Sequence, residues 1–439
     1  MFNTYSLPPS RFVFGRGEGA DKYRGLQQFG PFRGVSAGAT PTFGFVFPNE
    51  FKDYANNLFL ALKNGLGYFR GLETTFRVPL SKDQVFPVTG FSIPGDADPR
   101  RAARIYADAI ISWSSRATLR PDIFYVLHRR TSSWEDETPY YECKALLLEE
   151  GILSQDVTVD LIDNPSQFEW SIANIALATF AKLGGVPWVV GTRQQRNELV
   201  IGVGRADLFD PRARQSRRTM GFTACFSPQG LFEFVCLADI ARSRDEYLRI
   251  LFRLVSETLK RAVQRGTEEM SLVVHLPKQI SREESDVIRQ AVSSSSRDLK
   301  VDVCVIRVND EDEIFAVDLG AADGVPSRGT VVQTGDKAFV LYTEGREEKS
   351  SWRQRIPTAL RVSPQVPDDI SPQRVAALIS QVNDLSQVNW RGFNARSRPI
   401  STYYGHLIAN ILSHVPESVS AKLYLPKAKA VLENKMWFL

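Results

Sequence analysis

Short continuous apolar runs alternate with longer helical patterns up to about residue 190 of the chain. Buried strands are expected at three apolar runs, 42–47, 123–127 and 157–162. Apolar residues spaced three or four positions apart predict helices over 49–66, 98–114 and 168–183. Asp98 followed by Pro99 is typical of a helix start, with a capping side chain and a proline in the first turn. Strands that alternate with helices predict a doubly wound α/β domain.

The pattern changes after Pro187, where strands and a hairpin come before the next helices. An apolar strand is expected over 198–203, and residues 228–230 predict the turn of a hairpin. Capping boxes predict two helix starts, at Ser243 with Glu246 and at Ser281 with Glu284. Further strands are expected over 271–276, 301–308 and 338–342, and closing helices over 372–385 and 403–414. This order predicts a ribonuclease-H-like core, although other α/β folds share parts of it.

The composition is that of a globular protein, with 43% hydrophobic and 24% charged residues in a chain of 439. That length suits two or three domains. The net charge of +4 is small, so a nucleic-acid surface would have to be a local patch. The four cysteines lack the spacing of a zinc site, and no apolar run has membrane-spanning length. We therefore expect a cytoplasmic protein without a membrane partner.

Residues 180–188, F-A-K-L-G-G-V-P-W, end a long apolar helix and place Lys182 in its last turn. This lysine is either a surface residue or a cation at a polar site. Upstream, Thr138 as an N-cap would place Tyr140 and Lys144 one turn apart on one helix face, and Gln155 follows near the next strand. A helix N-terminus with a phenol, an amine and an amide suits a phosphate group. An ordinary solvated pair of side chains is the alternative.

Residues 138–188 resemble the MID domain of short prokaryotic Argonautes, which bind the 5′-phosphate of a guide strand. Four residues match the positions that hold this phosphate in the family: Tyr140, Lys144, Gln155 and Lys182. The resemblance also implies that the carboxylate of Leu439, with Gln155, binds a Mg²⁺ ion that bridges to the phosphate. Without such a cation, a carboxylate buried beside the phosphate would be repelled.

The second half of the chain resembles a PIWI domain. The matching positions are 201–203, His275, 389–393 and 398–406. Three arginines, Arg391, Arg396 and Arg398, lie close together in the sequence around Phe393. Cations with an interleaved aromatic residue suit binding of a nucleic-acid backbone. A solvated loop is the alternative interpretation.

A PIWI domain that cuts its target needs a cluster of carboxylates to hold two Mg²⁺ ions. The matching positions carry Gly204, Pro277 and His406, and only the histidine is a possible ligand. Asp207 lies an odd number of residues past Gly204, which places it on the other face of an extended strand. The resemblance therefore implies a catalytically inactive PIWI domain, in a chain that is not itself an enzyme.

The resemblance divides the chain into three parts. Residues 1–38 form a strand and loop that pack on the C-terminal lobe, 39–167 a Rossmann-like MID domain, and 168–439 a ribonuclease-H-like PIWI domain. It implies a short Argonaute without N and PAZ domains, carrying a guide RNA that pairs with single-stranded DNA of a plasmid or phage. It further implies a separately encoded APAZ protein with a TIR, Sir2-like or nuclease effector, which target binding switches on as a defence.

Three other functions fit parts of this pattern. The first is a divergent metal-dependent slicer that uses Asp207 and His406. The second is a stand-alone guided repressor that has no effector partner. The third is an α/β protein that binds a small phosphate ligand at Tyr140 and Lys144.

Overall fold

The computed structural model describes the chain except for residues 1, 36–39, 131–138, 192–196, 211–214, 236–242, 265, 296–298, 311–313, 347–356, 395 and 415–420. The side chains of 205, 207–225, 421 and 424 are also not described. The chain forms two compact units. Unit 1 comprises Met1–Phe12, Val189–Asn389 and Asn394–Ser413, and unit 2 comprises Val13–Trp188, Trp390–Phe393 and His414–Leu439. This division differs from the one expected from sequence, because residues 168–188 and the C-terminal residues belong to unit 2.

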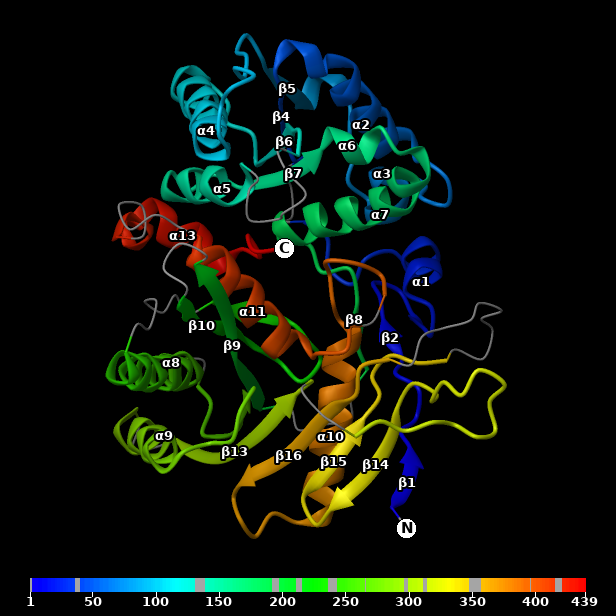
Figure 1. The fold of residues 1–439 in the computed structure, drawn as a ribbon, viewed down its shortest axis with the longest axis vertical. Coiled ribbons are helices and arrows are strands. Elements are labelled where there is room, and N and C mark those ends of the chain that lie inside the picture. Colours follow the sequence, from blue (N-terminus) through cyan, green and yellow to red (C-terminus); the bar gives the residue numbers. More distant parts are fainter. Residues whose placement is uncertain are drawn as a thin grey trace. The chain divides into compact units, whose positions relative to one another are not determined.

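Unit 2 is built on a four-stranded parallel sheet with the strand order β5-β4-β6-β7 (Figure 1). The strands are β4 Phe43–Val46, β5 Val85–Val88, β6 Ile123–His128 and β7 Ser154–Thr158. Its helices are α1 Lys22–Phe29, α2 Lys52–Asn64, α3 Leu72–Phe76, α4 Pro99–Arg116, α5 Tyr140–Glu149, α6 Val159–Ile162, α7 Pro165–Lys182 and α13 Pro426–Asn434. The expected alternation of parallel strands and helices is confirmed.

Local signals place the start of α4 correctly and the end of β7 incorrectly. The Asp98 side chain caps α4 by accepting from the backbone N–H of Arg101 at 2.8 Å, as its sequence predicts. The strand expected over 157–162 is wrong beyond Thr158, because β7 covers Ser154–Thr158 and residues 159–162 form α6. Pairing explains the shift: β7 lies in parallel register with β6 from Phe124 to His128, and this neighbour sets where the edge strand ends.

Unit 1 contains a nine-stranded mixed sheet in the order β1-β14-β15-β16-β13-β12-β9-β10-β11. The strands are β1 Asn3–Ser6, β9 Glu198–Asp210, β10 Gln215–Phe226, β11 Phe232–Phe234, β12 Glu269–Leu276, β13 Lys300–Asn309, β14 Thr330–Gly335, β15 Ala338–Leu341 and β16 Leu360–Val366. The short strands β2 Phe12–Val13, β3 Glu18–Gly19 and β8 Val189–Val190 lie near the boundary in sequence between the units. The antiparallel β9–β10–β11 meander beside parallel β12 and β13 is the ribonuclease-H-like pattern expected from the sequence.

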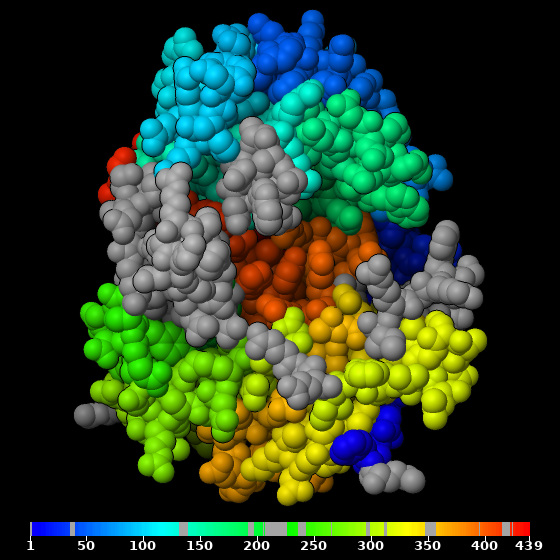
Figure 2. All heavy atoms as spheres, in the orientation of Figure 1, coloured from blue at the N-terminus to red at the C-terminus, as the bar shows by residue number. Residues whose placement is uncertain are grey.

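In the described part of unit 1, the helices beside the sheet are α8 Arg244–Gln264, α9 Arg282–Ser295, α10 Pro372–Gln387 and α11 Ile400–Ser413. Both predicted capping boxes are present, because Ser243 and Ser281 exchange hydrogen bonds with Glu246 and Glu284. Leucine, isoleucine and valine side chains of α8 and α9 form one apolar core with β12 and β13. Helix α11 lies against β9 and β10. The part of the chain that contains α11 is coloured orange in Figure 2, where some of it is visible at the molecular surface.

None of the described helices combines the length and the apolar character that a membrane crossing requires.

Candidate functional site

The first turn of α5 places a phenol and an amine together. Tyr140 is the first residue of the helix, and Nζ of Lys144 lies 5.3 Å from the centre of the Tyr140 ring. Burial raises the pKa of the Tyr140 phenol, and the charge of Asp156 raises it further, so the hydroxyl is a neutral donor. The i, i+4 geometry expected from the sequence is confirmed, but the N-cap of α5 is Pro139 and not the expected Thr138, which lies outside the described residues.

Lys182 is the last residue of α7 and is only 1% exposed. Its Nζ donates to the backbone carbonyl of Ser154 at 2.8 Å and to Oε1 of Gln155 at 2.9 Å. A lysine that only covered apolar surface would keep its amine in water. Of the two interpretations of this residue, the cation at a polar site is therefore the one that the structure supports. Gly184, with φ of 95°, takes the left-handed conformation that ends the helix.

The two buried lysines of this cluster interact with each other. Lys144 is 2% exposed, and its amine interacts electrostatically with that of Lys182. Burial lowers the pKa of both amines, and the charge of Lys144 lowers that of Lys182 further. Two like charges buried together repel, so the ligand-free pair resists carrying two positive charges. An added anion would favour both charges.

Asp156 is a member of the cluster that sequence reasoning did not single out. It follows Gln155 on β7, and its charge raises the pKa of both lysines. Its Oδ1 is buried without a hydrogen-bond partner among the described residues and lies 3.9 Å from Nε2 of His128. Burial lowers the pKa of that histidine, which favours the neutral ring. The sequence signal was an acidic residue directly after the amide of a proposed phosphate site.

Arg391 also belongs to this cluster rather than to a separate patch. It lies in unit 2, where its positive charge lowers the pKa of Tyr140, Lys144 and Lys182. Arg396 and Arg398 lie in unit 1. The Arg398 guanidinium is held by both carboxylate oxygens of Asp310, at 2.6 and 2.7 Å. The guanidinium of Arg396 lies 5.4 Å from the centre of the Tyr403 ring. The three arginines therefore do not have one common environment.

The cluster lies along the edge strand β7 and not beyond its carboxyl end. Gln155 is the second residue of β7, and it pairs with Tyr125 in the first half of β6. Lys182 ends α7, which leads back from the carboxyl end of β7 toward its beginning. In a parallel sheet, a helix that follows a strand returns the chain to the opposite edge, which brings Lys182 close to the start of β7.

The C-terminal residues pack beside the end of α7. Trp437, Phe438 and Leu439 are buried, and Nζ of Lys435 donates to the carbonyl of Leu183 at 3.3 Å. The expected Mg²⁺ ion does not fit Gln155 as a ligand in this arrangement, because the amide oxygen already accepts from the Lys182 amine. An ion at that oxygen would lie against a like charge. The orphaned Oδ1 of Asp156 is the adjacent oxygen that lacks a donor.

Gly204 occupies the first position at which a target-cutting PIWI domain would carry a carboxylate, and the backbone of α11 fills the space beside it. A Cβ atom at Gly204 on β9 would lie 2.0 Å from the carbonyl carbon of Gly405 and 2.1 Å from the nitrogen of His406. A Cβ atom at Gly202 would lie 2.6 Å from the carbonyl group of Ser401. The glycines thus let α11 rest directly on β9. A carboxylate at position 204 would require α11 to move.

The strand that leads to the second of these positions, Pro277, carries a buried histidine. His275 lies near the end of β12, its Nδ1 is 2.7 Å from Oγ of Ser401, and burial lowers its pKa to about 3. Pro277 follows this strand, and His406 is partly buried on α11. Among the described residues, no three His, Cys, Asp or Glu side chains gather closely enough to hold a metal ion. The side chain of Asp207 lies outside the described part.

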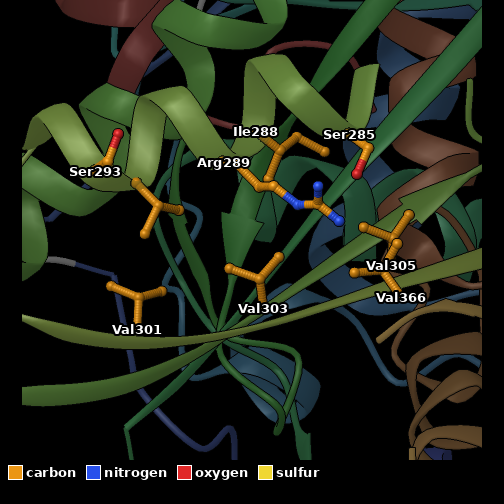
Figure 3. Close-up of a pocket in the computed structure, with 9 residues that line it drawn as sticks. Ser285, Ile288, Arg289, Ser293, Val301, Val303, Val305 and Val366 are labelled. Atoms are coloured by element: carbon orange, nitrogen blue, oxygen red, sulfur yellow. The ribbon is translucent and has the colours of Figure 1, made fainter. Parts of the chain in front are cut away.

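A separate pocket of about 290 Å³ lies under α9 in unit 1 (Figure 3). It is lined by Ser285, Ile288, Arg289, Val292, Ser293, Val301, Val303, Val305 and Val366. The wall is mostly apolar, and none of the predicted site residues contributes to it. We assign it no part in the chemistry of the cluster.

Comparisons with known proteins identify the family of the chain. The Piwi domain family matches residues 131–416, more than half of the 439-residue chain. The "Protein argonaute" of Cereibacter sphaeroides is 25% identical over 468 residues, which cover 100% of this chain and 59% of the relative. The "Piwi protein" of Archaeoglobus fulgidus is 22% identical over 323 residues, covering 70% of this chain and 73% of the relative. The chain thus spans 59% of the length of the first relative.

Solved structures share the fold at low sequence identity. Clostridium butyricum Argonaute, bound to a guide DNA and a target DNA, has a TM-score of 0.66 at 16% identity, covering 95% of this chain and 53% of that one. Drosophila Piwi has a TM-score of 0.66 at 12% identity, covering 99% of this chain and 56% of that one. These likenesses confirm the expected fold class, a mixed α/β structure with a ribonuclease-H-like PIWI fold.

Proposed function

The chain belongs to the Piwi-domain family of Argonaute proteins, and on this premise we propose that the cluster around Lys182 binds the 5′-phosphate of a guide RNA. One observation carries the proposal: two buried, electrostatically coupled lysines adjoin a neutral phenol donor and the charge of Arg391. Three cationic side chains face one carboxylate, that of Asp156. A terminal phosphate carries about −1.5 to −2 charges near pH 7, which balances this excess.

The proposal distinguishes a terminal phosphate from the rest of the strand. A phosphodiester carries one charge, so it compensates the two lysines less well than a monoester does. We propose that the guide pairs with single-stranded target DNA, while the protein reads backbone and leaves sequence to base pairing. The solved structure of Clostridium butyricum Argonaute, which holds guide and target strands, supports this reading.

A direct test compares binding of one RNA sequence with a 5′-phosphate or a 5′-hydroxyl, at two salt concentrations. The 5′-phosphate should strengthen binding by about tenfold or more, since hydrogen bonds to charged groups contribute about 1.5–3 kcal/mol. Equal affinity for both ends would reject the phosphate site. Free nucleoside monophosphate that binds as tightly as the RNA would instead favour the small-ligand alternative.

We further propose that the chain binds its target without cutting it. The tight approach of α11 to Gly204, which excludes a carboxylate at that position, supports this proposal. Mg²⁺- or Mn²⁺-dependent cleavage of a target that matches the guide would overturn it. If cleavage is lost in an Asp207→Ala variant, the divergent slicer is the correct function.

The remaining parts of the proposal concern partners. We propose a short Argonaute that works with a separately encoded APAZ protein carrying a TIR, Sir2-like or nuclease effector, in defence against plasmids or phages. Guide and target binding would switch this effector on. This role would be rejected if the effector activity of the purified complex did not change when a complementary target was added. A Mg²⁺ ion at the Leu439 carboxylate is a separate proposal, tested by whether a chelator weakens binding of the 5′-phosphorylated RNA alone.

A further inference from the structure

The pocket under α9 has a floor of valine side chains from two neighbouring strands. Val301, Val303 and Val305 lie at alternate positions of β13, and Val366 of β16 pairs with Val305. Alternate residues of a strand point to the same face of the sheet, so the three β13 valines face α9 together. Figure 3 shows them on one side of the pocket, with the residues of α9 on the other. The floor of the pocket is therefore apolar.

The side chains of α9 leave this floor incompletely covered. Ser285, Arg289 and Val292 are spaced by four and three residues along one side of the helix, and all three line the pocket. The serine side chain is too short to fill the space between helix and sheet, and the Arg289 side chain is mostly exposed to solvent. Because no long apolar side chain occupies these three positions, Val301 and Val303 stay only partly buried.

The size of the pocket limits what it can hold. A cavity of roughly 150 Å³ accommodates a benzene molecule, so the volume of about 290 Å³ corresponds to on the order of ten non-hydrogen atoms. A partner helix, about 10 Å across, is too wide for such a space. Mostly apolar walls with a few polar groups are typical of small-molecule sites. The pocket thus suits a small molecule with a hydrocarbon body.

The wall formed by α9 adds a cation to this apolar space. The Arg289 guanidinium lies 3.9 Å from a carboxylate oxygen of Asp286, and the two side chains are 74% and 73% exposed. An exposed ion pair of this length stabilises the protein little, so the carboxylate of a ligand can compete with Asp286 for the guanidinium. The hydroxyl-bearing Ser285 lines the same wall. These polar groups favour an anionic end on the ligand.

A second arginine continues the row of valines along β13. Arg307 lies two residues beyond Val305, and β13 keeps an unbroken register with β12 as far as Arg307, so its side chain points to the side of the sheet that α9 covers. Its Nε atom is buried and has no hydrogen-bond partner among the described residues. A buried donor without an acceptor is costly, and an acceptor from a ligand would remove that cost. Both arginines thus favour a ligand that carries negative charge.

We propose that the pocket under α9 binds a small aliphatic carboxylate. Its hydrocarbon chain would lie on the valines of β13. Its carboxylate would accept hydrogen bonds from Arg289 and Arg307, because planar guanidinium groups match the geometry of carboxylate oxygens. The pocket belongs to unit 1 and the lysine cluster to unit 2, so this binding and guide binding can fail independently.

The test titrates the full chain with octanoate and with a series of straight-chain carboxylates from butyrate to dodecanoate, by calorimetry. We expect one-to-one binding that strengthens by up to about fourfold for each added methylene group. The gain should stop near octanoate or decanoate, because the pocket is then full. 1-Octanol, which lacks the charge, should bind about tenfold more weakly than octanoate.

Three variants locate the ligand. Arg289→Gln and Arg307→Gln should each weaken octanoate binding by about threefold or more, whereas Arg24→Gln, at a residue 84% exposed in unit 2, is the matched control. Ser285→Leu fills the hollow from the side of α9 and should abolish binding. Since filling a cavity stabilises a fold, the thermal unfolding temperature of Ser285→Leu should not fall, which separates loss of the site from loss of folding.

Several results would overturn the proposal. These are absence of saturable octanoate binding, equal affinity for 1-octanol, and binding that survives Ser285→Leu. An affinity that keeps rising beyond decanoate would indicate adsorption to the surface and not to this pocket. Displacement of octanoate by single-stranded RNA would assign the arginines to nucleic acid. Binding of 5′-phosphorylated RNA, measured on the same variants, should stay unchanged and reports separately on the guide site.

Discussion

The Lys182 amine at the end of α7 and the Gln155 side-chain oxygen on β7 lie 2.9 Å apart in the buried part of unit 2. This contact connects the helix that precedes the G-G-V-P-W segment to the edge of the parallel sheet. It converts a lysine on an apolar helix into part of a polar cluster. The following predictions test that cluster and the packing of the PIWI-like unit.

Replacement of Lys182 by methionine keeps the length of the side chain and removes its charge. We expect Lys182→Met to weaken binding of a 5′-phosphorylated RNA by roughly 10- to 100-fold. A hydrogen bond to a charged group contributes about 1.5–3 kcal/mol, and its loss changes the affinity by about this factor. Binding of the 5′-hydroxyl RNA should change little. Lys429→Met, at an exposed lysine paired with Glu433, is the control. Equal losses for both RNA ends would return Lys182 to a purely structural role.

The two arginines Arg391 and Arg398 should behave differently. Arg391 acts on the charges of the phosphate cluster, so Arg391→Gln should reduce the preference for a 5′-phosphate by about tenfold. Arg398 is held by Asp310, and Arg398→Gln should lower thermal stability without changing that preference. Filter-binding with both RNA ends and thermal unfolding of both variants separate the effects. A preference that survives Arg391→Gln would place this arginine outside the site.

Guide binding should take up protons. The pKa values of Lys144 and Lys182 lie below the ordinary value of 10.5 in the ligand-free chain. The unfolded chain therefore binds more protons across the window below 10.5, and the stability of the ligand-free protein should rise with pH there. A bound phosphate favours charged amines and draws protons in, so affinity should fall as pH rises. Calorimetry in two buffers of different ionisation enthalpy measures this uptake, and its absence in wild type contradicts the coupling.

The approach of α11 to β9 should make position 204 intolerant of any side chain. Gly204→Ala is expected to destabilise the protein by about 1–3 kcal/mol through overpacking. Gly335→Ala is the matched control, because its Cβ would meet Ala338 at an ordinary 3.5 Å and should cost less than about 0.5 kcal/mol. Chemical denaturation of both variants checks the difference. A stable Gly204→Ala protein would show that α11 can move, and would reopen the question of a carboxylate there.

Local chemistry in the sequence determined the helix starts and the sheet class. Asp98 and the capping boxes at Ser243 and Ser281 involve residues three positions apart, so their hydrogen bonds depend on little beyond the first helical turn. The spacing of Tyr140 and Lys144 likewise required only a helix. The end of β7 at Thr158 was missed, because residues 159–162 were expected to continue a strand and instead form α6.

The tertiary structure alone decided which charges meet. Whether Lys182 reaches solvent or Gln155 depends on how α7 packs on β7, and burial then sets its pKa. The participation of Asp156 and Arg391 follows from the same packing, since Arg391 returns to unit 2 from a distant part of the chain. Sequence could propose the phosphate-binding residues by type and resemblance. Charge interactions fall with distance and strengthen on burial, and both quantities exist only once the chain is folded.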